Sequence, residues 1–238
     1  MATRRNLIVG VSWVILSVIG LVVAGNTEIH PFGASREARI SDDAFDFLLY
    51  LSIPVMAFVL VMGGYAVFRD RDRGADEDGA PIRDNRPFVS AWVLITSALA
   101  VLVIITPGFT GLDELRAEPE PEVIIDVQGE RWSWEFIYVD SDRRTRGTLV
   151  LPIDTRVMFR VTSTDVIHSF WIPAMRIKID AIPGTITTTM VTAEKLGSFS
   201  DESLLRVQCA ELCGVGHARM WTQVEVVTQE EFEAFVNG

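Results

Sequence analysis

The sequence predicts a membrane-anchored all-β protein, in which two or three N-terminal transmembrane helices precede a β-barrel or β-sandwich. Apolar runs long enough to cross a bilayer lie within the first 110 residues. From Val123 onward, short runs rich in valine, isoleucine, threonine and aromatic residues alternate with turn signals, as is typical of all-β domains. The hydrophobic content of 49% and the mean hydropathy of +0.28 are high for a protein without membrane segments.

The first apolar run, Leu7 to Gly25, has no charge and follows Arg4 and Arg5. A basic flank before an apolar core is common to transmembrane helices and signal peptides. The nineteen residues exceed a usual signal-peptide core, although Val23-Ala24-Gly25 is small enough to be cleaved. We therefore expect residues 1–25 to be a transmembrane helix, with a signal peptide as the alternative.

Residues 26–109 are expected to form a transmembrane anchor with helices over about 44–68 and 88–106. Pro54 should kink the first of these without ending it, because neighbouring helices can satisfy the freed carbonyl. The loop between them, residues 69–87, contains five arginines and is cytoplasmic by the positive-inside rule. The chain after this anchor then lies on the outer, periplasmic side of the plasma membrane.

Residues 110–122 form a charged, proline-containing linker, and residues 123–238 are expected to form the β-domain. The expected strands are Val123–Val127, Trp132–Val139, Thr148–Pro152, Arg156–Thr162, Ser169–Pro173, Thr185–Thr192, Leu204–Cys209 and Trp221–Val227. A terminal helix is expected over Gln229–Val236, with Thr228 as its N-cap and acidic residues in its first turn.

The charge balance excludes one class of partner. The chain has 32 acidic and 21 basic residues and a net charge of -11 at pH 7. Nucleic-acid binding requires a basic surface, so we expect no nucleic-acid partner and favour basic or metal-bearing ones.

Both cysteines lie in one short segment, Cys209–Met220, which we call the cysteine loop and which also contains His217. Thiolate, imidazole and thioether groups together are typical ligands of copper electron-transfer sites. A mononuclear blue-copper site uses one cysteine and two histidines, so the second cysteine allows two thiolates to bridge two metals. The second histidine must come from elsewhere; His168, in an apolar strand-like run, is the better candidate and His30 the other.

Two other interpretations of the cysteine loop stay open. A local disulfide between Cys209 and Cys213 is possible at this separation, but it leaves His217 and Met220 without a role. A zinc site of Cys209, Cys213, His217 and His168 also leaves Met220 idle, and its spacing differs from that of structural zinc sites.

The loop has the form Cys-x-Glu-x-Cys-x-x-x-His-x-x-Met and resembles the CuA-binding loop of subunit II of haem-copper cytochrome oxidases. Asp165–Gly184 and Gly129–Tyr138 resemble the same family, so the resemblance covers most of the chain. It implies a cupredoxin-like Greek-key fold for the β-domain. It also implies a subunit of a proton-translocating cytochrome-c oxidase, which takes electrons from an external cytochrome c or blue-copper protein and passes them to haem in subunit I for reduction of dioxygen to water.

The resemblance further implies roles for individual residues. The implied ligands of two copper ions are Cys209 and Cys213 as bridges, His168 and His217 as terminal ligands, Met220, and the backbone carbonyl of Glu211. The Glu211 side chain is implied to reach a magnesium ion at the contact with subunit I, the alternative being an exposed surface glutamate. Haem is implied only in the partner subunit.

Two tryptophans of the resembling stretch receive different roles. Trp132 and Trp134 are spaced to face the same side of a strand. The resemblance places Trp132 where the electron enters, although core packing is the commoner use of a strand aromatic residue. We assign Trp134 to core packing. Asp180, in another matching stretch, is expected near the subunit interface.

Other functions on the same scaffold remain open. A CuA subunit of a nitric oxide reductase has its distinguishing residues in the catalytic partner, so this sequence does not separate it from an oxygen reductase. The intact ligand set argues against a quinol-oxidase-type subunit II. A membrane-anchored copper carrier would have no use for Trp132 or Glu211. Val89 stands three residues before Trp92, where the family often has a glutamate of a proton channel.

Overall fold

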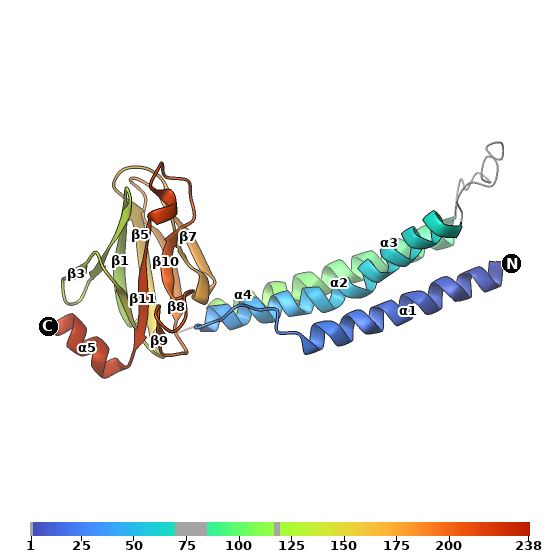
Figure 1. The fold of residues 1–238 in the computed structure, drawn as a ribbon, viewed down its shortest axis with the longest axis horizontal. Coiled ribbons are helices and arrows are strands. Elements are labelled where there is room, and N and C mark those ends of the chain that lie inside the picture. Colours follow the sequence, from blue (N-terminus) through green and yellow to red (C-terminus); the bar gives the residue numbers. More distant parts are fainter. Residues whose placement is uncertain (1, 70–84, 117–119) are drawn as a thin grey trace. The chain divides into compact units, whose positions relative to one another are not determined.

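The structure is a computed structural model that describes residues 2–69, 85–116 and 120–238 (Figure 1). These residues form two compact units: the apolar helices, and the β-domain together with residues 30–42, here called the connector. The predicted cytoplasmic loop, 69–87, lies mostly outside the described residues, and so does part of the predicted linker, 110–122.

The anchor contains the helices α1 (Ala2–Asn26), α2 (Arg36–Arg69) and α3 (Arg86–Val103), followed by a π-helical turn η1 (Ile104–Phe109) and α4 (Thr110–Arg116). Three spans in the described part of the chain are long and apolar enough to cross a membrane: Asn6–Asn26, Arg36–Phe68 and Arg86–Leu115. They confirm the expected apolar helices.

Two helix boundaries differ from the expectation because polar residues join the helices. α2 begins at Arg36 rather than near residue 44, since Ser35 Oγ caps it by accepting a hydrogen bond from the Ala38 N–H at 3.1 Å. At the other end of the anchor, η1 and α4 extend helical structure through Arg116, into the predicted linker.

Within the helical unit, α1 packs against α2 around Pro54. α2 continues through Pro54, as expected for a proline in a membrane helix. The Trp13 indole N–H donates to the Pro54 carbonyl at 2.7 Å, and its ring lies edge-on to Phe58. A Cβ atom at Gly20 would lie 2.7 Å from Ile53 Cγ2, so this glycine lets the two helices approach closely.

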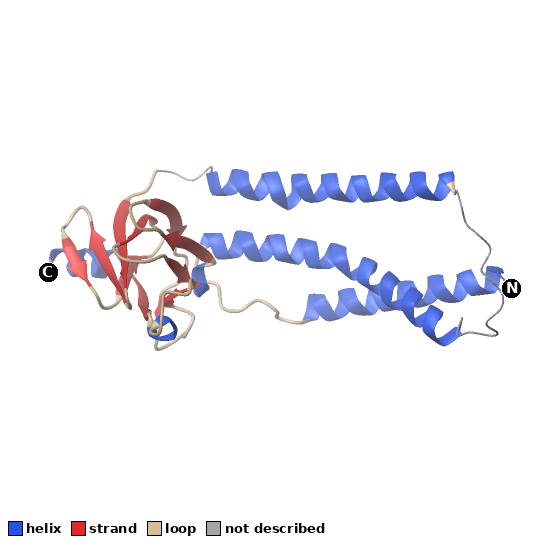
Figure 2. Cartoon of the chain, turned by 90° about the horizontal axis from the view of Figure 1, so that it is seen from above, coloured by secondary structure: helices blue, strands red, loops and turns tan. Residues whose placement is uncertain are grey.

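Two sheets make up the β-domain, whose strands are shown in Figure 2. The first sheet has the order β3 (Arg143–Thr145), β2 (Ser133–Tyr138), β1 (Val123–Glu130), β5 (Arg156–Ser163), β8 (Thr187–Thr192). The second has the order β4 (Leu149–Pro152), β11 (Trp221–Val227), β10 (Arg206–Cys209), β6 (His168–Ile172), β7 (Ile177–Ala181), with β9 (Gly197–Ser198) paired to β11. β1 with β5 and β4 with β11 are parallel, and the remaining pairs are antiparallel.

Alternating side chains of the two sheets form the core, as the period of a β-strand requires. Representative buried residues are Ile125, Val127, Phe159, Val161, Phe170, Ile172, Val224 and Val226. Cys209, Cys213 and Met220 belong to the same buried cluster, so the cysteine loop is continuous with the core. The C-terminal helix α5 (Gln229–Asn237) has the predicted N-cap: Thr228 and Glu231 form a reciprocal capping box.

The connector packs on the β-domain, which corrects the prediction that residues 26–109 all belong to the anchor. The Ala34 N–H donates to the Ala174 carbonyl at 2.7 Å, and the Ala34 carbonyl accepts from the Glu194 N–H at 2.8 Å. The Arg176 guanidinium binds both carboxylate oxygens of Asp42 at 3.1 Å and the carbonyl of Phe32 at 3.1 Å. Arg176 thus clamps both ends of the connector.

Replacing Arg176 with alanine is expected to lower the free energy of unfolding of the β-domain by about 2–3 kcal/mol, because Asp42 and the connector carbonyls lose a largely buried charged donor. Arg176 already has a positive φ of 53°, and alanine keeps this backbone strain unchanged. Denaturant unfolding of the full chain in detergent measures the change. Arg39→Ala is the control: its exposed ion pair with Glu194 should contribute less than about 1 kcal/mol. Equal effects of the two variants would contradict the clamp.

Candidate metal centre

The cysteine loop connects two adjacent strands, and the backbone fixes both of its ends. Cys209 is the last residue of β10, and Met220 directly precedes β11. The Cys209 N–H donates to the Met220 carbonyl at 3.0 Å, which closes the loop. The Ala210 N–H donates to Ser169 of β6 at 3.0 Å and so ties the loop to the strand that begins with His168.

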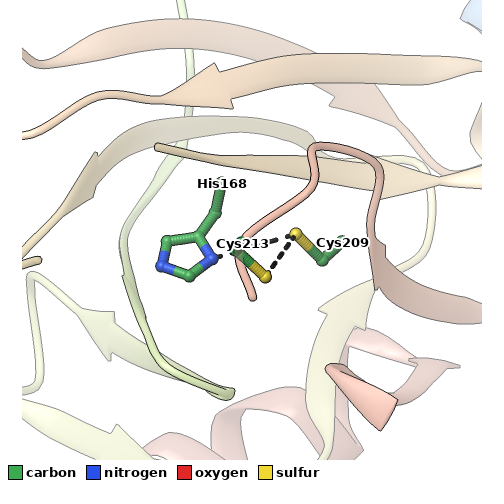
Figure 3. Close-up of side chains that lie close together, drawn as sticks. All are labelled: His168, Cys209 and Cys213. Carbon is green, nitrogen blue, oxygen red and sulfur yellow. Dashed lines mark hydrogen bonds between the residues drawn. The ribbon is translucent and has the colours of Figure 1, made fainter. Parts of the chain in front are cut away.

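The two cysteine sulfur atoms lie at the centre of the site. Figure 3 shows Cys209, Cys213 and His168 with their side chains turned toward one another. The two Sγ atoms are 3.7 Å apart and both cysteines are free, which differs from the disulfide alternative. Cys209 Sγ lies 3.8 Å from His168 Nδ1, and Cys213 Sγ lies 3.6 Å from His217 Nδ1. Each sulfur thus faces the imidazole nitrogen of a different histidine.

The remaining predicted ligands surround the same sulfur atoms. Met220 Sδ is 3.8 Å from Cys213 Sγ, and the Glu211 carbonyl oxygen is 3.2 Å from Cys209 Sγ. The structure therefore brings together all six predicted ligand residues. His30, the other histidine considered, instead lies 3.5 Å from Asp42 in the connector.

Burial separates the metal-facing groups from the groups on the surface. Cys209, Cys213, Met220 and His168 are each less than 5% exposed, whereas Glu211 is exposed. Burial raises the pKa of the Cys213 thiol well above its usual range, and the neighbouring Cys209 sulfur raises it further. In the metal-free site Cys213 is therefore protonated at neutral pH, and a metal that binds it must displace the proton.

Comparison with known proteins identifies the family of the chain. The family model described as cytochrome c oxidase subunit II, periplasmic domain, matches residues 139–227. Cytochrome c oxidase subunit 2 of Thermostichus vulcanus is 30% identical over an alignment that covers 93% of this chain and 82% of that relative. The chain belongs to the cytochrome c oxidase subunit II family. The probable cytochrome c oxidase subunit 2 of Rickettsia bellii (strain RML369-C) is 32% identical, over 80% of this chain and 76% of the relative.

A solved structure is also similar to this subunit II chain. The periplasmic domain of subunit II of cytochrome oxidase from Bradyrhizobium japonicum matches with a TM-score of 0.46 and 32% identity, over 50% of this chain and 93% of that structure. Family membership confirms the resemblance drawn from the motifs. Together with the apolar helices and the two-sheet domain, it confirms the predicted fold class, a membrane anchor followed by a cupredoxin-like domain.

The donor set fits the copper centre of the subunit II family. Buried thiolates and a thioether are soft donors that favour Cu(I), and imidazole suits both copper oxidation states. Both histidines direct Nδ1 toward a cysteine sulfur, so each ring has one nitrogen available for a metal beside the thiolates. A zinc site made of cysteine and histidine would leave the buried Met220 thioether, 3.8 Å from Cys213 Sγ, without a role.

Trp132 and Trp134 occupy different environments, which corrects the expectation that both face one side of a strand. Trp132 lies in the turn between β1 and β2 and is 39% exposed, whereas Trp134 on β2 is 1% exposed. Trp134 packs edge-on against His168 and Phe170, as expected of a core residue. The turn carries Trp132 toward the cysteine loop, where its indole N–H donates to the Cys213 carbonyl at 3.2 Å.

Asp165 is a further site residue, which the sequence motifs do not predict. Its Oδ1 lies 2.9 Å from His168 Nε2, and its Oδ2 accepts from the Arg131 side chain at 2.8 Å and from the Arg131 N–H at 3.0 Å. Burial favours the neutral acid, but hydrogen bonds from His168, from the Val166 N–H and from Arg131 outweigh it and hold the pKa of Asp165 well below its usual range. The carboxylate therefore holds the proton on Nε2 and leaves Nδ1 free to bind a metal.

Asp165→Ala is expected to weaken copper binding by about 10–100-fold, because His168 loses the group that fixes its tautomer and ring orientation. Asp165→Asn, which keeps an acceptor oxygen but loses the charge, should have a smaller effect. A copper titration of the full chain against a competing chelator measures both affinities. Asp140→Ala, at an exposed turn, is the matched control and should bind copper as the unchanged chain does. Wild-type affinity in Asp165→Ala would exclude this role.

Proposed function

We propose that this chain is the electron-accepting subunit II of a respiratory haem-copper oxidase and that its cysteine loop and His168 hold a binuclear CuA centre. One observation carries the proposal: two thiols, two imidazole Nδ1 atoms and a thioether converge, each within 3.8 Å of a cysteine sulfur. A mononuclear blue-copper site would require only one of the two cysteines.

Two copper ions would be held by the Cys209 and Cys213 thiolates, by Nδ1 of His168 and of His217, by the Met220 thioether and by the Glu211 carbonyl. When bound, the copper pair would take up and release single electrons. The protein's part is to keep the ligands in place. Backbone hydrogen bonds close the loop at Cys209 and Met220, and burial of both cysteines excludes water from the sulfur atoms.

Two exposed groups at the cysteine loop, Trp132 and the Glu211 side chain, suggest the proposed partners. Trp132 and the exposed end of the loop receive an electron from an external cytochrome c or blue-copper protein. The Glu211 carbonyl is directed at Cys209, and its side chain is exposed, with Oε1 accepting a hydrogen bond from the Leu212 N–H at 3.2 Å. We propose that this carboxylate binds magnesium at the contact with subunit I. Haem, dioxygen reduction and proton translocation belong to that partner, and the β-domain lies on the outer side of the plasma membrane.

Copper loading of the full chain in detergent tests the proposal. The full chain is needed because the connector is part of the β-domain. We expect two copper ions per chain by elemental analysis, and an electron paramagnetic resonance spectrum in which one unpaired electron couples equally to two copper nuclei. Coupling to one nucleus, or preferential retention of a single zinc ion, would overturn the binuclear assignment.

A further inference from the structure

The Trp132 indole lies directly against a glycine of the cysteine loop. A Cβ atom built on Gly216 would stand 2.2 Å from Trp132 Cδ2 and 2.5 Å from Trp132 Cγ, far inside van der Waals contact. These are atoms at the base of a rigid ring, which cannot move aside as the end of a flexible side chain does. A Cβ on Gly214, by contrast, would meet the same ring at an ordinary 3.5 Å. Of the two glycines in the cysteine loop, Gly216 is the one at which a side chain would overlap the indole.

The backbone of Gly216 does not itself require glycine. Its φ and ψ are -94° and 3°, which residues with a side chain also adopt. Gly216 is buried, and the ring that covers it belongs to Trp132. Glycine is therefore needed at position 216 because it leaves space for the indole, and not because of its backbone conformation.

The position of the Trp132 indole against Gly216 allows a hydrogen bond between the indole and the cysteine loop. With the indole against Gly216, its N–H reaches the Cys213 carbonyl at 3.2 Å. One hydrogen bond thus links a side chain that is 39% exposed to the backbone of a buried cysteine whose sulfur faces His217. A methyl group at position 216 would push the indole away from the loop. The Trp132 N–H would then be too far from the Cys213 carbonyl to form this hydrogen bond.

We propose that Gly216 is a positioning residue for electron transfer: it seats Trp132 on the cysteine loop, so that an electron arriving at the indole reaches Cys213 through a single hydrogen bond. No covalent bond forms or breaks in this step, and the electron comes from the external carrier. The inference rests on the proposed function for its electron-transfer role. The contact between the Trp132 ring and Gly216, here called the seat, is present in the metal-free chain.

Gly216→Ala in the full chain, purified in detergent, tests the seat without metal. Acrylamide quenching of the Trp132 fluorescence is obtained as the difference between each protein and its Trp132→Phe counterpart. We expect Trp132 to become more accessible to acrylamide in Gly216→Ala. Gly147→Ala is the matched control, because a Cβ there meets only Thr145 Oγ1 at 3.5 Å. Unchanged quenching in Gly216→Ala would overturn the seat.

The copper-loaded proteins test the role in electron transfer. Reduction by a soluble reduced cytochrome c should be about tenfold slower in Gly216→Ala, as expected for a misplaced contact group. Reduction by ascorbate, which needs no docking at the indole, should be unchanged. In the Trp132→Ala background, Gly216→Ala should cause no further loss, because its effect acts through the indole. A further loss of similar size would exclude the proposal.

A folding defect would also be decisive. Suppose that Gly216→Ala fails to fold while the double variant with Trp132→Ala folds. The new methyl group then clashes with the indole, and the contact between Trp132 and Gly216 is supported. If both fail to fold, glycine is needed for another reason and the proposal is wrong. Failure of the unchanged chain to bind two copper ions would overturn the proposed function, whereas the metal-free quenching result would still decide the seat.

Discussion

Cys213→Ser is expected to abolish the proposed binuclear copper centre and to leave at most one copper ion per chain. Cys213 Sγ lies close to three other candidate ligand groups: it is 3.7 Å from Cys209 Sγ, 3.6 Å from His217 Nδ1 and 3.8 Å from Met220 Sδ. A serine hydroxyl has nearly the same shape, but it is a hard donor that remains protonated at neutral pH, so it does not bridge two copper ions. The metal-free chain should still fold, at a cost of about 1–3 kcal/mol for the buried hydroxyl.

Copper content and the electron paramagnetic resonance spectrum measure this result. Coupling of the unpaired electron to two nuclei should disappear, and reduction by a cytochrome c should be lost with it. Met220→Leu is the matched control on the same loop: it removes a weak thioether donor and fills the space with a side chain of similar size. That variant should retain both copper ions and change only the reduction potential. Two copper ions with the original spectrum in Cys213→Ser would show that Cys213 does not bridge.

The clustering of the proposed ligand residues could be predicted because most of them are local in sequence. The cysteine loop carries four of the proposed ligand residues in its side chains and supplies the Glu211 carbonyl from its backbone, so their proximity depends on a single turn between neighbouring strands. His168 was the better of two remaining histidines because it lies in an apolar run, and the structure places it at the start of β6, beside β10. The helix cap at Thr228 was predictable for the same reason, since its partner, Glu231, is three residues away.

The contacts that the sequence did not predict join residues far apart in the chain. Arg176 binds Asp42 across 134 positions, and an arginine after a proline-containing turn carries no signal of such a partner. Trp132 meets Gly216 only because the hairpin turn of the first sheet lies against the loop of the second. Asp165 had a detectable signal, since an acid three residues before a buried histidine can turn back to its imidazole.

The two tryptophans of the β1–β2 hairpin should therefore respond in opposite ways to the same substitution. Trp134→Ala removes a fully buried ring that packs against His168 and Phe170, and it should lower the free energy of unfolding by about 3–5 kcal/mol. Trp132→Ala removes a ring at the surface and should change stability far less. Thermal or denaturant unfolding of the metal-free chains separates the two.

Trp132→Ala should instead slow reduction of the copper-loaded chain by a cytochrome c about 100-fold, because the carrier loses both its contact surface and the hydrogen-bonded link to the Cys213 carbonyl. Copper content should not change, since no ligand atom is removed. Trp132→Phe keeps the aromatic ring and loses only the N–H donor, so its rate should fall between those of the unchanged chain and Trp132→Ala. If Trp132→Phe were as slow as Trp132→Ala, the hydrogen bond would carry the whole effect. If both were as fast as the unchanged chain, the electron would reach the cysteine loop by another route, and the exposed indole would have no part in it.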